Sequence, residues 1–256
     1  MLDAIRQVAP QLKEKGGGHE LSTRRYREKL RCHKKDIFGK EVNMIMEALD
    51  SKRLKYNKTI FQIHVTLGAR EGSSNSQSGL CGLSWDRFKK NFTRVDLYES
   101  KVRGGIWWRD CPLDLFFDDL PKQLKTLWKD RDCPVDKKLI IGSYRELRGI
   151  YKEIRQALAE YYEGKLDPSL FKELTTIRPH DSNKIHVNLL WEAGISLEVI
   201  AGEYLGHGEG IGLTGRGWLD INTIKKHYLS LTQRSEGFKR LLRQIRLYSH
   251  RFNGRN

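Results

Sequence analysis

Apolar residues in the first part of the chain recur at helical spacing. Within residues 34–54 they fall on one face of a helix with 3.6 residues per turn, and residues 56–69 follow as a second apolar helix. The periodic positions of the first segment are Ile37, Val42, Ile45, Met46 and Leu49. The polar run "SSNSQSG" at residues 73–79 then interrupts the pattern and predicts a loop.

Three short segments after this loop have the character of strands. They are "LSWDRF" (83–88), "TRVDLYES" (93–100) and "GGIWWRDCP" (104–112). In the second segment Val95 and Leu97 alternate with polar neighbours, as in a strand with one buried face. The glycines of "KVRGG" predict a hairpin between the second and third segments, so we expect one small three-stranded antiparallel sheet.

Helical patterns dominate the remainder of the chain. Residues 113–130, 143–164 and 180–194 have helical periodicity, and Gly194 is placed to cap the last of these helices. Residues 236–252 form a basic amphipathic pattern. The predicted fold class is therefore mainly α, within the α+β type, with one small antiparallel sheet.

The composition changes near the start of the first periodic helix. Residues 1–33 are polar and basic and contain three consecutive glycines at 16–18. They indicate a linker, or the remnant of a longer segment. Residues 34–256 are expected to form the main domain, which is long enough to bury a substantial core.

The charge balance narrows the class of partner. The chain has 47 Lys and Arg against 32 Asp and Glu, a formal net charge of +15 that is spread along its length. A distributed positive excess on a folded protein favours a polyanionic partner, most simply nucleic acid. The alternative at this point is a basic protein whose charge serves only its solubility.

Cysteine usage and hydropathy exclude several other classes. The four cysteines contain no C-x-x-C pair, so the sequence predicts neither a zinc site nor a compact disulfide framework. No apolar run has the length of a signal peptide or a transmembrane helix. We expect a cytoplasmic protein that needs no metal or other cofactor and has no membrane partner.

One glycine-rich stretch matches a nucleotide-binding pattern only superficially. Residues 210–215 read "GIGLTG", a G-x-G-x-x-G string, but residues 196–207 before it have helical spacing in place of the required strand. Further glycines at 208 and 217 argue against a helix start within the string. A loop is the better interpretation.

Five polar side chains stand at suggestive places along these elements. Arg70 follows the second apolar helix, Lys101 lies at the hairpin, and His180 opens a helix. His207 ends "EYLGH", and Tyr228 lies in "KKHYL". Each has an ordinary explanation when taken alone, as a solvated charge, a capping residue or a core aromatic.

Taken together and in this order, the five residues resemble the catalytic domain of the tyrosine recombinase, or phage integrase, family. "TIFQIHVTLGAREG" (59–72) resembles the helix that delivers the first arginine, and "LSWDRF" resembles the strand after it. "VDLYESKVRGGIWWRDCPL" (95–113) is similar to the hairpin that bears the lysine, and residues 180–207 resemble the block from His-x-x-Arg to Leu-Gly-His. The likeness covers residues 34–235, and its final segment is most similar to archaeal integrases of mobile elements.

The resemblance implies a metal-independent cleavage chemistry. Tyr228 would attack a DNA phosphodiester and become a 3′-phosphotyrosine, while Arg70 and His207 donate hydrogen bonds to the phosphate oxygens. Lys101 would protonate the leaving 5′-oxygen, and His180 would assist proton transfer or contact the phosphate. The glycine-rich loop would let Tyr228 reach this site or that of a neighbouring subunit. The resemblance also implies double-stranded DNA as the partner and self-association into dimers or tetramers on it. It further implies that residues 1–33 are a basic linker or the remnant of an N-terminal DNA-binding domain.

Two features depart from the family pattern. The polar loop after Arg70 is longer than the family's compact turn. More importantly, the second arginine of His-x-x-Arg falls on Asn183, an amide that can donate but carries no charge. Lys184 or Arg178 could supply the missing cation, although Lys184 lies about 100° round the helix from position 183.

These observations leave three hypotheses. The first is a site-specific DNA recombinase or integrase whose cleavage is impaired by Asn183. The second is a non-catalytic, recombinase-derived DNA-binding protein that regulates integration or excision. The third is an enzyme like type IB topoisomerases, which would relax supercoils without sequence preference.

Overall fold

The computed structural model describes residues 35–72, 77–102, 105–134, 140–200 and 229. Contacts divide the chain into Met1–Lys34 and Lys35–Asn256, and every described residue belongs to the second unit. The segment 1–33, the glycine-rich stretch and the basic helix expected at 236–252 therefore lie outside the described residues, and those interpretations stay predictions.

The described residues form a mainly helical fold with one three-stranded antiparallel sheet, which confirms the predicted fold class. Helix α4 (Lys55–Leu67) is its centre: it is buried on nearly all sides and contacts α3 (Gly39–Ser51), α5 (Leu120–Lys129), α6 (Tyr144–Tyr162) and α8 (Ser182–Glu192). The five periodic positions predicted within residues 34–54 are buried in the core, four of them on α3 and Ile37 just before it.

The sheet has the order β1–β2–β3, with β1 at Phe88–Lys89, β2 at Arg94–Val102 and β3 at Gly105–Pro112. Strands β2 and β3 form the predicted hairpin, in which Val95 pairs with Cys111 and Val102 with Gly105. Val95 and Leu97 are fully buried, as their alternation predicts. The register is irregular between Glu99 and Val102.

The first predicted strand is mostly wrong. Trp85–Arg87 form a 3-10 turn (η2), only Phe88 of "LSWDRF" lies in β1, and Leu80–Gly82 form a further turn (η1). The Ser84 hydroxyl bonds the Asp86 carboxylate, a local contact that favours a turn over a strand. Lys90–Phe92 (η3) then have left-handed φ angles, which end the strand after two residues.

Two helices also differ from the prediction. The helix expected over 113–130 begins only at Leu120 as α5, because Pro121 is tolerated in the first turn of a helix but not in its interior. Helix α7 (Pro168–Thr175) was not predicted, although Asp167 caps it by accepting from the backbone N–H of Ser169 and Leu170.

The remaining described elements agree with their predicted positions. Helix α6 matches residues 143–164, with the Ser143 hydroxyl accepting from the backbone N–H of Glu146 at 3.2 Å. A short turn, η4 (Pro179–Asp181), precedes α8, and Gly194 follows α8 with φ of +99°. A single turn, α9 (Leu197–Val199), comes next.

Candidate active site

The candidate site begins where α4 ends. Gly68 terminates the helix with a left-handed φ of +52°, and a Cβ atom built there would lie 2.5 Å from Cδ2 of His186 in α8. The His186 ring also donates from Nδ1 to the carbonyl of Val65 at 2.9 Å. Gly68 therefore serves both as a helix terminator and as the point where α8 approaches the end of α4.

The segment after Gly68 carries Arg70 and Glu71 and is held by its backbone. The Arg70 carbonyl accepts from the N–H of Leu80 at 2.9 Å, and the Glu71 carbonyl accepts from that of Cys81 at 2.8 Å. Gly72 and Gly79 both have positive φ angles, which lets the two ends of the polar loop approach closely. The two ends of the loop are thus held together next to Arg70, whose side chain is half-buried.

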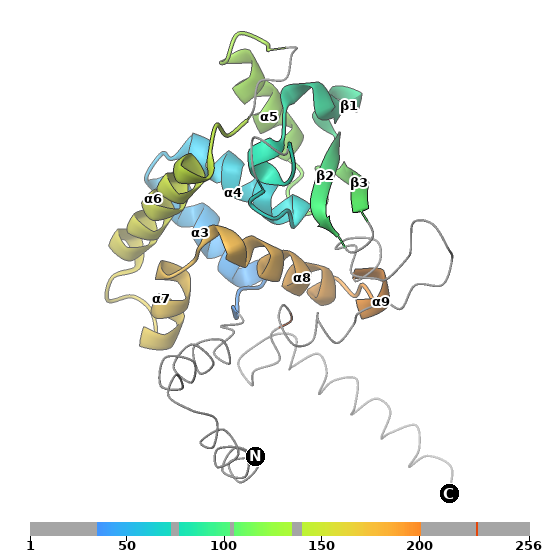
Figure 1. Ribbon diagram of the computed structural model, residues 1–256. Helices are drawn as coiled ribbons and strands as arrows, with labels where there is room; N and C mark the ends of the chain where they lie inside the picture. Colours follow the sequence, from blue (N-terminus) through green and yellow to red (C-terminus); the bar gives the residue numbers. More distant parts are fainter. Residues whose placement is uncertain (1–34, 73–76, 103–104, 135–139, 201–228, 230–256) are drawn as a thin grey trace, which may run out of the picture. The chain divides into compact units, whose positions relative to one another are not determined.

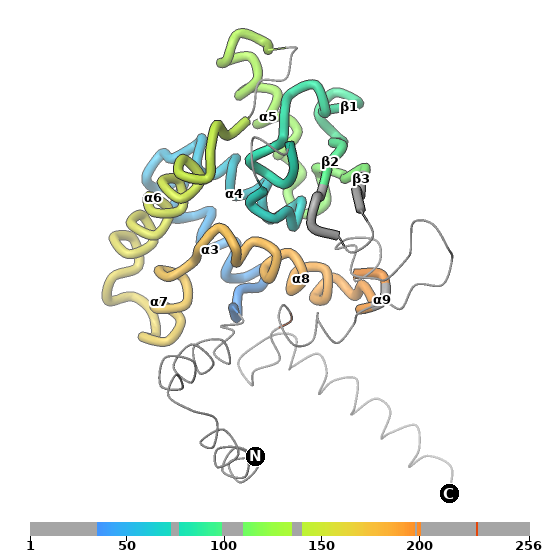
Figure 2. The backbone as a smooth tube through the Cα atoms, viewed as in Figure 1, coloured from blue at the N-terminus to red at the C-terminus, as the bar shows by residue number. Residues whose placement is uncertain are grey.

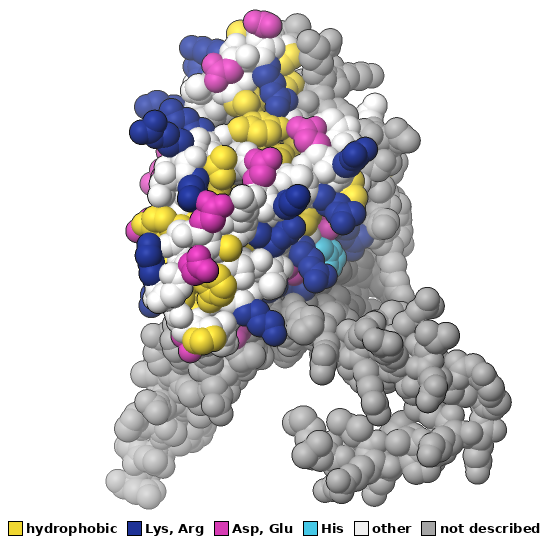
Figure 3. Space-filling model, turned by 90° about the vertical axis from the view of Figure 1, so that its left-hand side faces the viewer, with side chains coloured by type: hydrophobic (Ala, Val, Ile, Leu, Met, Phe, Trp, Pro, Cys, Tyr) yellow, Lys and Arg dark blue, Asp and Glu magenta, His cyan; other side chains and the backbone are white. Residues whose placement is uncertain are grey.

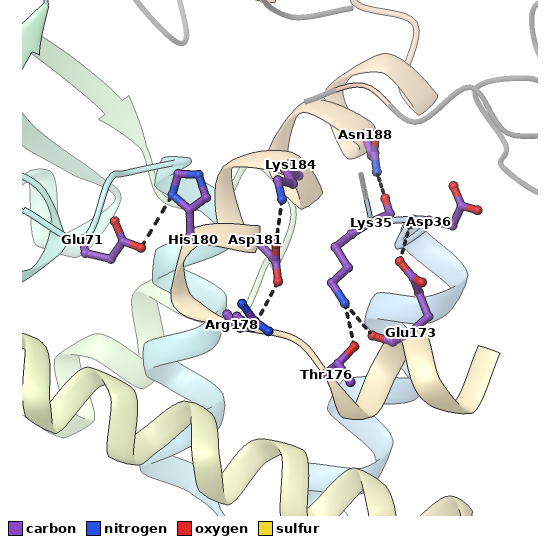
Figure 4. A network of polar contacts seen from close by, with 10 residues as sticks. All are labelled: Lys35, Asp36, Glu71, Glu173, Thr176, Arg178, His180, Asp181, Lys184 and Asn188. Carbon is purple, nitrogen blue, oxygen red and sulfur yellow. Dashed lines mark hydrogen bonds and ion pairs between the residues drawn. The ribbon is translucent and has the colours of Figure 1, made fainter. Parts of the chain in front are cut away.

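The turn before α8 brings His180 to this segment. Its Nδ1 atom lies 3.7 Å from Oε1 of Glu71, an ion-pair distance longer than a normal hydrogen bond, while 62% of the His180 side-chain surface remains exposed. The turn is fixed by Asp181, which accepts from the backbone N–H of Arg178 at 3.0 Å. Figure 4 shows the His180 ring directed toward Glu71.

Asn183 lies one helical turn further, against the end of α4. With its amide oriented to donate, its nitrogen lies 2.6 Å from the carbonyl oxygen of Gly68 and 2.7 Å from that of Ala69. Its side chain is buried. The amide therefore satisfies backbone acceptors at the helix end instead of projecting toward solvent.

Neither Lys184 nor Arg178 supplies the positive charge that is missing at position 183. Lys184 Nζ contacts Oδ1 of Asp181 at 3.0 Å, and both side chains are buried, so its charge is committed to that carboxylate. Arg178 is exposed and lines a separate hollow with Arg148 and Arg155 of α6.

A buried histidine, His64, also contacts the segment that bears Arg70. His64 of α4 lies within 3.1 Å of the Ala69 carbonyl through Nε2 and within 2.9 Å of the Tyr151 hydroxyl through Nδ1. A carbonyl can only accept, so Nε2 carries the proton and Nδ1 accepts from Tyr151. Burial lowers the pKa of His64 to about 4, against the opposing effects of Glu71 and the Ala69 carbonyl. The ring is therefore neutral at pH 7.

Glu71 is an ionised carboxylate at neutral pH. Its partial burial acts to raise its pKa, but the His180 ring, its own backbone N–H and the nearby His64 together hold that pKa below the ordinary value. Burial also raises the pKa of the neighbouring Cys81 thiol to about 12, so this cysteine remains a neutral core residue.

The predicted lysine, Lys101, belongs to the β2–β3 hairpin. This residue lies in β2 within the irregular register between Glu99 and Val102. Bulges and similar irregularities are frequent next to active sites, where they re-aim a side chain. The backbone of Lys101 therefore lies near the turn of the hairpin, next to the pair formed by Val102 and Gly105.

Apart from Lys101, the predicted site residues thus fall into two groups. Arg70, His180 and Asn183 come from two distant parts of the sequence, and the segment 68–71 and the start of α8 meet through Asn183 and Glu71. His207 and Tyr228 lie outside the described residues.

Two residues of the site were missed by sequence reasoning. Glu71 follows Arg70 within the same motif, and its position beside a predicted catalytic arginine was a usable signal. His64 stands as a polar residue in an apolar helix, a pattern that predicts a satisfied core histidine without naming its partners Ala69 and Tyr151.

Comparison with protein-family models, with curated proteins and with solved structures gave no match. Within the described ranges, no helix is long and apolar enough to span a bilayer. Those same residues contain no group of three or more His, Cys, Asp or Glu side chains arranged to hold a metal ion.

Proposed function

We propose that this protein is a tyrosine-type site-specific DNA recombinase, an integrase that cleaves and rejoins DNA through a 3′-phosphotyrosine. The observation that carries the proposal is the meeting of two distant motifs: His180 and Asn183 at the start of α8 contact the segment that bears Arg70 and Glu71. The sequence resemblance requires this juxtaposition, whereas unrelated polar residues on separate helices have no reason to share it.

The chemistry suits the side chains that converge. The phenol oxygen of Tyr228 attacks phosphorus, the P–O5′ bond breaks, and the electron pair leaves with the 5′-oxygen. Arg70 stabilises the extra negative charge on the phosphate oxygens, since a planar guanidinium offers two parallel donors. Lys101 supplies the proton to the leaving oxygen, and His180, steadied by Glu71, accepts or relays the proton of Tyr228.

Asn183 weakens this chemistry because it brings no second positive charge. Its amide nitrogen already donates to two carbonyls at 2.6 and 2.7 Å, so it adds little to the phosphate. Removing one charge-assisted donor at a developing oxyanion typically costs about 10²–10³ in rate. We therefore infer a slow cleavage step, with His207 completing the phosphate contacts.

The second candidate function is a non-catalytic DNA-binding regulator of integration or excision. The saturated and uncharged Asn183 favours it, because the fold and the positive surface persist without the second arginine. In both cases double-stranded DNA is the partner, with self-association into dimers or tetramers on it.

Covalent trapping separates these functions. The protein is incubated with a pool of nicked duplexes of degenerate sequence, in which a cleaved strand diffuses away and prevents religation. A recombinase yields a denaturant-resistant protein–DNA species that Tyr228→Phe abolishes, whereas a regulator binds the duplexes and yields none. Relaxation of any supercoiled plasmid without sequence preference would instead indicate a topoisomerase-like enzyme.

A further inference from the structure

A second basic feature lies outside the candidate active site, between α6 and the segment that precedes η4. There a hollow of about 480 Å³ is lined by Tyr144, Arg148 and Arg155 of α6 together with Thr175 and Arg178. Figure 3 views the molecule from the side on which α6 lies in Figure 1, and Lys and Arg side chains gather on that face.

The charges of α6 are sorted onto different faces by a seven-residue repeat. Glu146, Glu153 and Glu160 recur along one stripe, where they bond to Tyr56, Asn57 and Lys52. Arg148 and Arg155 recur with the same spacing along another stripe. Because seven residues are nearly two helical turns, each set of charges lies along one side of α6. The acidic side chains contact α4 and the link that precedes it, while the arginines face the hollow.

The three guanidinium groups carry like charges, and no carboxylate described in this part of the structure offsets their repulsion. Among the described residues, no carboxylate lines the hollow or forms an ion pair with any of them. Partial burial and the charges of Arg178 and Arg148 lower the pKa of Arg155. Since concentrated like charge in a half-enclosed hollow is unfavourable, a bound anion would stabilise the arrangement.

The positions of these arginines are set by local structure. Arg155 Nη1 donates to the Ile177 carbonyl at 2.9 Å, which ties α6 to the segment before η4. Arg148 lies with its Cζ 5.9 Å from the ring centre of Tyr144, whose surface is 47% exposed. The walls of the hollow are therefore fixed by α6 and by the segment before η4, and they do not depend on a single side chain.

One turn of the chain joins the hollow to the candidate active site. Arg178 stands two residues before His180, and Asp181 bonds the backbone N–H of Arg178 and closes the turn between them. An anion held by Arg178 would thus share one fixed turn with His180. A DNA strand carries one phosphate per nucleotide, so a strand that has one phosphate at His180 presents others along the same surface.

We propose that the hollow lined by Arg148, Arg155 and Arg178 binds a backbone phosphate of duplex DNA beside the phosphate that is cleaved. This inference rests on the proposed function, because it takes DNA as the ligand. The contact would carry no sequence information and would set the register of the duplex relative to His180. Planar guanidinium donors suit the paired oxygens of a phosphodiester.

The test compares charge-matched variants in duplex binding as a function of salt. The triple variant Arg148→Gln/Arg155→Gln/Arg178→Gln loses three charges in the hollow, and Lys40→Gln/Lys122→Gln/Lys129→Gln loses three exposed charges elsewhere. We expect the hollow variant to bind roughly tenfold more weakly than the control variant at about 0.1 M salt. Its log–log salt slope should fall by about 0.9, the value for one phosphate contact.

Two further variants keep the test informative if the triple variant is unstable. Arg148→Gln/Arg178→Gln preserves the Arg155–Ile177 hydrogen bond, and thermal unfolding of each variant checks the fold. Arg155→Lys keeps the charge and loses the fork, so it should retain the salt slope while losing part of the affinity.

The outcomes distinguish this inference from the proposed function. If the wild-type protein binds duplex DNA and the hollow and control variants behave alike, the phosphate assignment is overturned while the recombinase proposal stands. If the wild-type protein binds no duplex even at low salt, the proposed function fails and the assignment fails with it. Vesicles of phosphatidylserine and phosphatidylcholine provide the remaining arm: an Arg-dependent interaction with vesicles, but not with DNA, would also overturn the assignment.

Discussion

The side-chain amide of Asn183 donates to the carbonyl oxygen of Ala69 across 2.7 Å, joining the first turn of α8 to the residue before Arg70. The same carbonyl lies 3.1 Å from Nε2 of His64, so both of its lone pairs are used. Arg70 is thus positioned by a buried polar network. Position 183 therefore has a structural role whether or not the protein cleaves DNA.

Removing the Asn183 amide should destabilise the fold. Asn183→Ala leaves the buried carbonyls of Gly68 and Ala69 without this donor, at a cost of about 1–3 kcal/mol in the free energy of unfolding. Asn183→Asp has the same shape but presents an acceptor to two acceptors, so we expect a larger loss. Urea unfolding at pH 7.5 measures both, and an Asp variant as stable as wild type would contradict the donor assignment.

Restoring a positive charge at position 183 should accelerate cleavage. Asn183→Arg adds a charge-assisted donor beside Arg70, and we expect the single-turnover rate to rise at least about tenfold while DNA affinity changes much less. The buried site must also accommodate added volume, which costs roughly 1–3 kcal/mol of stability.

A generic added cation serves as the control for this variant. Thr126→Arg places the same charge on the exposed surface of α5. It should change binding slightly and leave the cleavage rate unaltered. An Asn183→Arg protein that binds more tightly but cleaves no faster would mean that position 183 does not take the arginine's place.

His64 should make stability depend on pH. Its pKa of about 4 in the folded protein lies below the ordinary value of about 6.5, so the unfolded chain binds the extra proton between these values. Stability is therefore complete above pH 6.5 and falls as pH decreases, by roughly 2 kcal/mol between pH 7.5 and 5.

A histidine-free variant isolates this contribution. His64→Gln keeps a donor for the Ala69 carbonyl and removes the titrating ring, so it should be less stable at pH 7.5 yet lose less stability on acidification. Chemical unfolding at the two pH values, at constant ionic strength, gives the comparison. Parallel losses in both proteins would show that His64 does not carry the effect.

Gly68 should tolerate no side chain. Gly68→Ala combines a left-handed φ of +52° with the 2.5 Å approach to the His186 ring, so we expect a loss above the roughly 1 kcal/mol of left-handed strain alone. Gly164→Ala, with φ of +68° and no atom nearby, isolates that strain. Gly149→Ala, at an exposed position within α6, should stabilise the protein instead. Thermal unfolding of the three variants tests this order.

The sequence predicts those elements whose stability is set by burial along one face. The periodic residues of α3, and Val95 and Leu97 in the hairpin, occupy the predicted faces because exposing either set would cost the hydrophobic energy of the core. The segment before β1 was mispredicted because aromatic residues there pack around a turn: Trp85, Phe88 and Phe92 cluster with one another, and Phe92 reaches Trp128. Composition alone does not distinguish such a cluster from a strand.

The sequence indicated which residues to examine as a candidate site, but not the residues that hold them in position. Motif order indicated Arg70, His180 and position 183, whereas the roles of Glu71 and His64 depend on contacts across the fold. The pairing of Lys184 with Asp181 likewise depends on how the turn η4 closes. These contacts are set by packing geometry, to which hydrophobic periodicity is insensitive.

The identity of the amino acid that becomes joined to DNA tests the central claim most directly. Covalent complexes formed by the wild-type protein and by Asn183→Arg on the nicked duplex pool are digested with nuclease and trypsin, and the peptides are sequenced by mass spectrometry. The account predicts a nucleotide joined through its 3′-phosphate to Tyr228, with no such peptide from Tyr228→Phe. A nucleotide on another residue, a 5′ linkage, or no adduct from either protein would contradict it.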